Sequence, residues 1–351
     1  MSTILPATHW ASSATADDGD GDTASTDASS IASSILQYRT LYGRTYHSEG
    51  SGAQYWATND QKQSEAMDIL HHTLTLILDG KLYAAPLEGK KIEKVLDVGC
   101  GTGIWAMDFA DEFPGATVIG TDISPIQPTW VQPNVTFEID DCTKPWTFPD
   151  DSFDFIHIRW MLGSIVDWTA LFKEAYRSLK PGGYLQSFEP DAIIQSDDGS
   201  IKSTDAMGQW AAIFTEGGKK MNRSFNIVND DLQLTAMREA GFVEVGEKNL
   251  RVRDFPLLIL CYMFLLTMSR KTPVGSWPRN EKQKEIGTWA KLVIEHDTEG
   301  YILFMATTLG WTREDVLAYI KQLHREIRSG RKQGYYRQKV VWGRKPEAGQ
   351  Q

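Results

Sequence analysis

The sequence predicts an α/β protein with a seven-stranded, mostly parallel sheet. Short apolar runs alternate with longer segments of helical periodicity, and the strongest run ends in a glycine-rich turn that leads straight into a helix. Strands that alternate with helices are joined by right-handed crossovers, which leave neighbouring strands parallel.

Seven runs have the length and composition of strands. They are KVLDVG (94–99), ATVIGTD (116–122), NVTFEID (134–140), FDFIHIR (153–159), YLQSFE (184–189), FVEVGEK (242–248) and RQKVVWGR (337–344). Helical periodicity falls between several of them, around 104–112, 168–180 and 205–240.

The segment ahead of the sheet divides into two parts. Residues 1–34 contain 27 Ser, Thr, Ala, Asp or Gly and no Lys or Arg. Such a composition cannot bury enough apolar surface to offset its ordering entropy, so we predict a disordered acidic tail. Residues 35–80 have helical periodicity, clearest from Lys62 to Asp79, and Gly80 follows as a C-terminal cap.

A long insertion, 249–335, separates the last two predicted strands and contains helical patterns near 281–296 and 312–329. The resulting organisation is a tail (1–34), a helical N-terminal cap (35–90), a main domain that includes the insertion (91–346) and a short tail (347–351).

Composition and charge exclude several classes of protein. The 351 residues are 41% apolar and 23% charged, an ordinary globular composition. Three cysteines without a CxxC pair do not make a disulfide framework or a structural zinc site, and we expect no metal. The first residues lack the features of a signal peptide, and the longest apolar run, Phe255 to Met268, is too short to cross a bilayer. We therefore expect an intracellular protein, in cytoplasm or nucleus, without a membrane partner.

The net charge of −10 argues against a dedicated nucleic-acid binder. One basic stretch, 313–345, has 10 Lys or Arg against 3 Asp or Glu. It is compatible with phosphate contact, but we favour a solvated helix face in an acidic chain.

The strongest functional signal is VLDVGCGTG, from Val95 to Gly103. A strand ends near Asp97, a turn with three glycines follows, and a helix begins. Ligands of open α/β sheets bind beyond the carboxyl ends of the strands, where glycines let a ligand approach the backbone and the first helix amides are free to donate. The glycine spacing fits neither the dinucleotide fingerprint nor the phosphate loop of nucleotide hydrolases.

Two further acids follow the next two strands. Asp122 ends a strand 25 residues after Asp97, where a carboxylate is well placed to bind both hydroxyls of a ribose. Asp141, in IDDC (139–142), is suited to the exocyclic amine of an adenine. Three such signals on successive strands describe a site for an adenosine derivative.

The chain resembles the class I S-adenosylmethionine-dependent methyltransferases, and among them the fungal LaeA-like family. The resemblance covers about Leu36 to Pro346. It lies in DGKLYAAPL, VLDVGCGTGIWAMDFADEFPGATVIGTDISPIQPTWVQPNVTFEIDD, PWTFPDDSFDFIHIRWMLGSIVDW, AYRSLKPGGYLQ, PVGSWP and WGRKP. It implies a Rossmann-like class I methyltransferase fold and S-adenosyl-L-methionine as cofactor.

The resemblance also implies how that cofactor is held. Its methionine part would lie on Gly99, Cys100, Gly101, Thr102 and Gly103, with Asp97 near the ammonium group. Asp122 would bind the ribose, Ile123 would pack on the adenine, and Asp141 with the Cys142 amide would contact the adenine edge.

Candidates for the acceptor pocket are Tyr46, His47, Arg159, Trp160 and Glu189. Arg159 would lie near the methyl donor or form a surface ion pair. His157 is expected to be a buried core histidine, and no residue is assigned as a catalytic base, since methyl transfer needs one only when the acceptor must lose a proton.

Three functions remain open. The first is a methyltransferase of fungal secondary metabolism acting on a small molecule. The second is a LaeA-type regulator of secondary-metabolite gene clusters that acts on a protein or in a nuclear complex. The third is a binding module without turnover, which the intact glycine turn and acids disfavour.

One segment departs from the family pattern. In the family, the sixth strand leads almost directly to the PVGSWP-like segment, but here 19 residues intervene, Val252 to Arg270. They are either a lid helix over the acceptor or the translation of an unspliced short intron.

Overall fold

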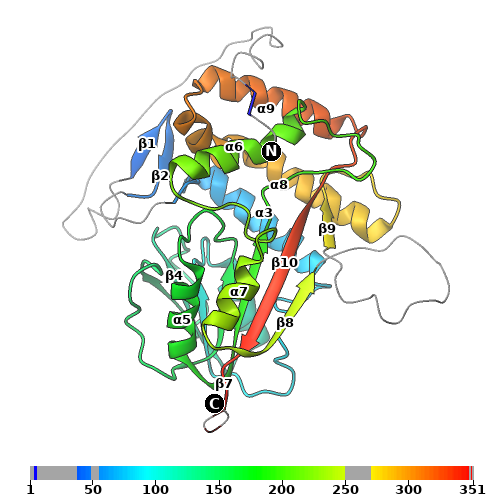
Figure 1. Cartoon of the computed structure of the whole chain (residues 1–351). Helices are drawn as coiled ribbons and strands as arrows, with labels where there is room; N and C mark the ends of the chain where they lie inside the picture. Colours follow the sequence, from blue (N-terminus) through cyan, green and yellow to red (C-terminus); the bar gives the residue numbers. More distant parts are fainter. Residues whose placement is uncertain (1–3, 6–37, 49–54, 250–269, 348, 350–351) are drawn as a thin grey trace, which may run out of the picture.

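The structure is a computed structural model that describes residues 4–5, 38–48, 55–249, 270–347 and 349 (Figure 1). Apart from Ile4 and Leu5, the predicted tail lies outside the described residues. So does the extra segment 252–270, apart from Arg270, and neither prediction about these segments is tested.

All seven predicted strands form one sheet in the order β5-β4-β3-β6-β7-β10-β8. The strands are β3 (Lys94–Val98), β4 (Thr117–Asp122), β5 (Val135–Ile139), β6 (Phe153–Arg159), β7 (Leu179–Pro190), β8 (Val243–Asn249) and β10 (Tyr335–Arg344). The first five in sequence are parallel, whereas β10 runs antiparallel to both β7 and β8. An eighth strand that was not predicted, β9 (Arg270–Pro273), pairs with the start of β10.

The strand order reverses between β3 and β6, because the chain runs outward from β3 through β4 to β5 and then returns to start β6 beside β3. This reversal leaves a crevice at the carboxyl ends of β3 and β6, the usual ligand position of open α/β sheets. The predicted site therefore lies where the topology favours one.

Helices cover both faces of the sheet. Along each central strand alternate residues point to opposite faces, so Val95 and Phe155 share a core with α4 (Ile104–Glu112). Leu96 and Ile156 point the other way, toward the face covered by α5 (Trp168–Ser178) and α7 (Leu232–Glu239). Burial on both faces explains why these strands read as continuous apolar runs.

The predicted helix over 35–80 is only partly correct. Helix α3 (Gln61–Ile77) forms as expected, but β1 (Arg39–Leu41) and β2 (Arg44–Tyr46) make an antiparallel hairpin. The two residues between them, Tyr42 and Gly43, both have positive φ, at 52° and 76°. Such a two-residue turn matches the twist of a hairpin and cannot continue a helix.

The insertion contributes the helices α8 (Glu281–Thr308) and α9 (Arg313–Arg328). They pack with α6 (Ala206–Lys220) and α3 in a helical layer at one end of the sheet, above it in Figure 1. Helix α8 is longer than predicted and is kinked at Asp297, and the predicted helical region 205–240 forms two helices, α6 and α7. One hydrophobic core joins residues of the cap, the sheet and the insertion, such as Trp56, Leu96 and Ile302.

Candidate functional site

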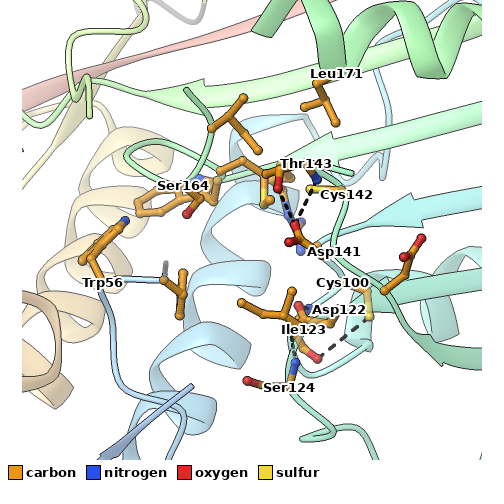
Figure 2. Close-up of a pocket in the computed structure, with 18 of the residues that line it drawn as sticks. Trp56, Cys100, Asp122, Ile123, Ser124, Asp141, Cys142, Thr143, Ser164 and Leu171 are labelled. Atoms are coloured by element: carbon orange, nitrogen blue, oxygen red, sulfur yellow. Dashed lines mark hydrogen bonds between the residues drawn. The ribbon is translucent and has the colours of Figure 1, made fainter. Parts of the chain in front are cut away.

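A cavity of about 680 Å³ lies at the carboxyl ends of β3, β4 and β6, a size typical of small-molecule sites. The sheet, α3 and α8 all contribute to its wall. Of the residues predicted to bind cofactor, those that line it are Gly99, Cys100, Gly101, Thr102, Asp122, Ile123, Asp141 and Cys142. Figure 2 shows Asp122 and Ile123 beside the turn that carries Cys100, with Asp141 and Cys142 at the next strand end.

The glycine turn needs its glycines for conformation and for space. Gly99, Gly101 and Gly103 have φ of 67°, 57° and 78°, in the left-handed region that side chains rarely adopt. A Cβ on Gly99 would lie 2.4 Å from the Met161 sulfur, and one on Gly103 would lie 2.2 Å from the Phe137 ring. Gly103 is the N-cap of α4, so the turn presents the start of that helix.

Asp122 is tied to the glycine turn. Its Oδ2 accepts a hydrogen bond from the Gly101 N–H at 2.9 Å, and its Oδ1 accepts from the Ser124 N–H at 2.9 Å. Burial raises the pKa of this carboxyl to about 6. Each carboxylate oxygen can accept two hydrogen bonds, so each still has a site for a hydroxyl donor.

The two carboxylate oxygens of Asp141 differ, because one accepts hydrogen bonds from the described residues and the other does not. Its Oδ1 accepts from the Thr143 N–H at 3.0 Å and from the Thr143 hydroxyl at 2.6 Å (Figure 2). Its Oδ2 is buried and has no partner among the described residues. Cys142 beside it lines the cavity, and burial raises the pKa of its thiol well above the usual value.

Asp97 lies behind the glycine turn and does not line the cavity. Its Oδ1 accepts a hydrogen bond from His157 Nδ1 at 2.9 Å, and the His157 ring stacks on Trp105 with centroids 3.7 Å apart. His157 is thus the buried core histidine that was expected, and burial lowers its pKa. The other oxygen of Asp97 is buried without a partner in the described part of the chain. Gly103 is likewise outside the cavity wall.

Arg159 faces the cavity and is not the surface ion pair considered above. Both terminal nitrogens of its guanidinium donate to His71 Nδ1 at 3.2 Å. The other ring nitrogen of His71 donates to Asp108 on α4 at 2.9 Å. Burial lowers the pKa of Arg159 to about 10.

Helix α3 is fastened onto this site at several points. Asp68 accepts a hydrogen bond from the Thr102 hydroxyl at 2.7 Å, and Met67 packs against Gly101. Just before the helix, Asn59 donates to the Ser124 hydroxyl at 3.4 Å. The N-terminal cap therefore forms one wall of the cavity.

The acceptor candidates divide into two groups. Arg159 and Trp160 line the cavity, and Trp160 holds a left-handed φ of 58° with its indole N–H unpartnered among the described residues. Tyr46, His47 and Glu189 are not among the residues that line it. Tyr46 packs on Phe304 of α8, and His47 lies behind Ser124.

Glu189 has a supporting position instead. It is fully buried and accepts hydrogen bonds from the Met161 and Leu162 N–H groups, both at 3.0 Å. It therefore fixes the turn that presents Trp160. Burial raises the pKa of its carboxyl to about 8.

Three other residues at the site were not predicted from the sequence. His71 reaches Arg159 from α3, and Asn59 and Tyr301 line the cavity from the cap and from α8. Because they belong to elements far apart in sequence, only the tertiary packing reveals them. The adjacent histidines 71 and 72 in a helical pattern were the single available signal.

The basic stretch 313–345 is extensively paired with acids. Arg328 contacts Glu295 at 2.8 Å, and Lys345 contacts Asp151 at 2.7 Å. Arg337 likewise pairs with Asp191 at 3.0 Å. The stretch is not a single helix face as we favoured, because it continues from α9 into strand β10, which contains Arg337.

The described residues contain neither a metal site nor a membrane-spanning helix. No group of three or more His, Cys, Asp or Glu side chains is arranged as a metal site. Among the described helices, none combines the length and apolar character required to span a membrane.

The family comparison agrees with this geometry. A family profile described as "Methyltransferase domain" matches residues 69–244. The chain is 33% identical to "Methyltransferase pytC" of Aspergillus terreus over 303 residues, 85% of this chain and 86% of that protein. It is also 33% identical to "Secondary metabolism regulator LAE1" of Cochliobolus heterostrophus over 262 residues, 74% of this chain and 77% of that protein.

Solved structures give a weaker likeness. The phosphoethanolamine N-methyltransferase 2 of Haemonchus contortus, solved with S-adenosyl-L-methionine, aligns with a TM-score of 0.44 and 18% identity. The alignment covers 81% of this chain and 52% of that chain. The profile and the fungal relatives are sufficient: the chain belongs to the methyltransferase domain family, which uses S-adenosylmethionine, and it is a methyltransferase related to fungal methyltransferases and LaeA regulators.

Proposed function

We propose that this methyltransferase acts on a small molecule of fungal secondary metabolism and holds S-adenosylmethionine at the ends of β3, β4 and β5. The observation that supports this most is the convergence of the glycine turn, Asp122 and Asp141 on one cavity whose far wall is aromatic. The names of the fungal relatives place secondary metabolism in the same family.

The residues present fit the cofactor. Asp122 has open acceptor sites for the two ribose hydroxyls, and the buried, unpartnered Oδ2 of Asp141 awaits a donor such as an adenine amine. Ile123 lines the cavity between them, where an apolar side chain can pack on a base. Asp97 would reach the ammonium group only from behind the turn, through its own unpartnered oxygen.

When bound, the cofactor supplies a methyl group on a sulfonium, a strong electrophile with a good leaving group. The chain therefore has to bind, align and exclude water. Holding both reactants in line contributes on the order of 7–11 kcal/mol. Helix α3 and α8 close the cavity opposite the sheet, which restricts water around the electrophile.

The aromatic wall supports a small, largely apolar acceptor. Trp56, Trp160 and Tyr301 line the main cavity and also a second one of about 60 Å³ beside it. The second cavity is bounded further by Trp210, Phe214 and Tyr336. The Trp160 indole N–H is buried without a partner among the described residues, so a polar group of the acceptor could pair with it.

The alternative is a regulator that methylates a protein or acts in a nuclear complex. The chain is 33% identical both to the regulator LAE1 and to the methyltransferase pytC, so identity does not separate the two functions. Because fold alone does not fix the acceptor, only an experiment separates the two.

The test uses a donor with a radioactive methyl group, incubated with the protein and a fungal extract. Our proposal expects label in the solvent-extractable fraction, and Trp160→Ala should reduce that label while S-adenosylhomocysteine still binds. Label found only in precipitated protein would support the regulator instead. Failure of S-adenosylhomocysteine to bind in calorimetry would contradict both.

A further inference from the structure

Arg159 is a half-buried cation, and the register of its strand defines its position. It is the last residue of β6, and Ile158 before it pairs with Val98, the last residue of β3. Arg159 therefore stands beside Gly99, where the glycine turn begins. Since alternate residues share a face, Arg159 projects from the same face as His157 and lines the cavity.

The guanidinium has no acidic partner among the described residues. Its recorded hydrogen bonds go to His71 Nδ1, a neutral acceptor, because the Nε2–H of that ring is donated to Asp108. Burial also lowers the pKa of His71, which keeps this ring neutral, so it accepts hydrogen bonds from Arg159 without compensating its charge. Two carboxylates, Asp97 and Asp108, interact electrostatically with Arg159. Each of them already accepts a hydrogen bond from a histidine.

A half-buried guanidinium without an anion has an uncompensated positive charge, and its planar donors match a carboxylate. Arg223 also lines the cavity, but its guanidinium donates a hydrogen bond to the Ser164 carbonyl. The carboxylate that interacts electrostatically with Arg223 is Asp141. Arg223 thus belongs to the part of the cavity near Asp141, and Arg159 to the part near the glycine turn.

Building on the proposed function, we propose that Arg159, positioned by His71 and Asp108, binds the α-carboxylate of the methyl donor's amino-acid part. The carboxylate would compensate this half-buried cation beside the glycine turn, where the proposed function places the amino-acid part of the donor. His71 is a positioning residue, because it accepts hydrogen bonds from both terminal nitrogens of Arg159 and so orients the guanidinium. The pair makes the cavity selective for the intact amino acid over a plain nucleoside.

The experiment compares two ligands that differ in one group. S-adenosylhomocysteine and its decarboxylated derivative are titrated by calorimetry into wild type, Arg159→Gln and Arg159→Lys. We expect wild type to bind the carboxylate-bearing ligand with roughly 10- to 150-fold higher affinity, which corresponds to the free energy of a hydrogen bond to a charged group. Arg159→Gln should reduce the preference to within about threefold, and Arg159→Lys should retain part of it.

The matched control is Arg223→Gln, which removes a guanidinium from the other part of the same cavity and should keep the wild-type preference. His71→Ala should lower the preference without abolishing it, whereas a purely structural role would weaken both ligands equally. Thermal melting of every variant confirms folding.

Three results would overturn the inference. An unchanged preference in Arg159→Gln would do so, and a higher KM for the acceptor in that variant would then assign the guanidinium to an anionic acceptor. Loss of the preference in Arg223→Gln would move the carboxylate to the other part of the cavity. If wild type bound neither ligand, the proposed function would fail together with this inference.

Discussion

At the scale of single residues, the protonation of Asp122 should make ligand binding depend on pH. Its folded-state pKa of about 6 means that it is partly protonated in mildly acidic solution. Ribose hydroxyls donate to the ionised form, so binding should lower that pKa and release protons. We expect affinity for S-adenosylhomocysteine to rise as pH increases through about 6 and to level off above 7. Calorimetry in buffers of different ionisation enthalpy checks this, and an affinity independent of pH between 5 and 7 would contradict it.

Replacing that carboxylate gives a second prediction. Asp122→Asn removes the negative charge and leaves one acceptor oxygen in the side chain. In wild type the Gly101 and Ser124 N–H groups donate to two different oxygens. We expect S-adenosylhomocysteine to bind more weakly by about 1–3 kcal/mol. The control is Asp111→Asn on the exposed surface of α4, which should bind like wild type. Equal binding by the Asp122 variant would remove this carboxylate from the site.

Single residues also show why part of the site was predictable. Asp122 and Asp141 follow strands directly, and the carboxyl ends of parallel strands meet at one edge, so their convergence follows from the pattern. His71 and Tyr301 reach the cavity from helices whose packing no local pattern encodes. Glu189 was assigned to the acceptor pocket because it ends a strand, but its side chain turns to the Met161 and Leu162 amides.

At the scale of elements, the hairpin β1–β2 shows the limit of periodicity. Its strands have three residues each, too short for an alternating pattern to stand out, and the dipeptide Tyr42–Gly43 is a weaker turn signal than Asn-Gly. The strands of the sheet were predictable because burial on both faces produces long apolar runs. Short β9 was missed for the same reason as the hairpin.

The turn after β6 depends on Glu189, which gives a prediction about stability. The folded-state pKa of about 8 lies above the ordinary value of 4.5, so the folded protein binds the proton more tightly than the unfolded chain. This stabilisation is complete below about pH 4.5 and is lost as pH rises toward 8. In wild type this loss should contribute to a decrease in melting temperature between about pH 4.5 and 8. Glu189→Gln should abolish that contribution.

The comparison for this turn is Glu174→Gln, whose carboxyl has a pKa lowered overall: although its burial acts upward, hydrogen bonds from Arg177 and the Trp146 amide outweigh it. That variant should keep the decline in stability between pH 5 and 8. If Glu189→Gln retained the wild-type decline, the carboxyl would be ionised throughout and held by the two amides alone.

At the scale of the whole molecule, cap, sheet and insertion share the site. The cavity wall takes Asn59 and Gln63 from the cap and Tyr301 from the insertion. The predicted boundaries at 35, 90 and 249 therefore divide a single cavity, and they remain predictions about sequence organisation.

A buried ionic cluster joins the cap to the insertion. Arg44 of the hairpin pairs with Asp297 at the kink of α8 at 2.6 Å and with Asp60, the N-cap of α3. The Asp297 side chain is fully buried. Because this arrangement needs both ends of the chain in place, no segment of sequence reveals it.

Removing Arg44 tests whether the cluster holds the molecule together. Arg44→Met leaves the buried Asp297 carboxylate with the Gly300 N–H and the more distant Lys62 ammonium, 3.7 Å away. We expect a loss of about 3–5 kcal/mol in the free energy of unfolding. Since Asn59 and Gln63 adjoin this cluster in sequence, S-adenosylhomocysteine should also bind more weakly. The control is Arg313→Met, which removes a more exposed arginine paired with Glu299 and should cost less than about 1 kcal/mol. Urea denaturation measures both, and equal losses in the two variants would show that the cap is held by apolar packing instead.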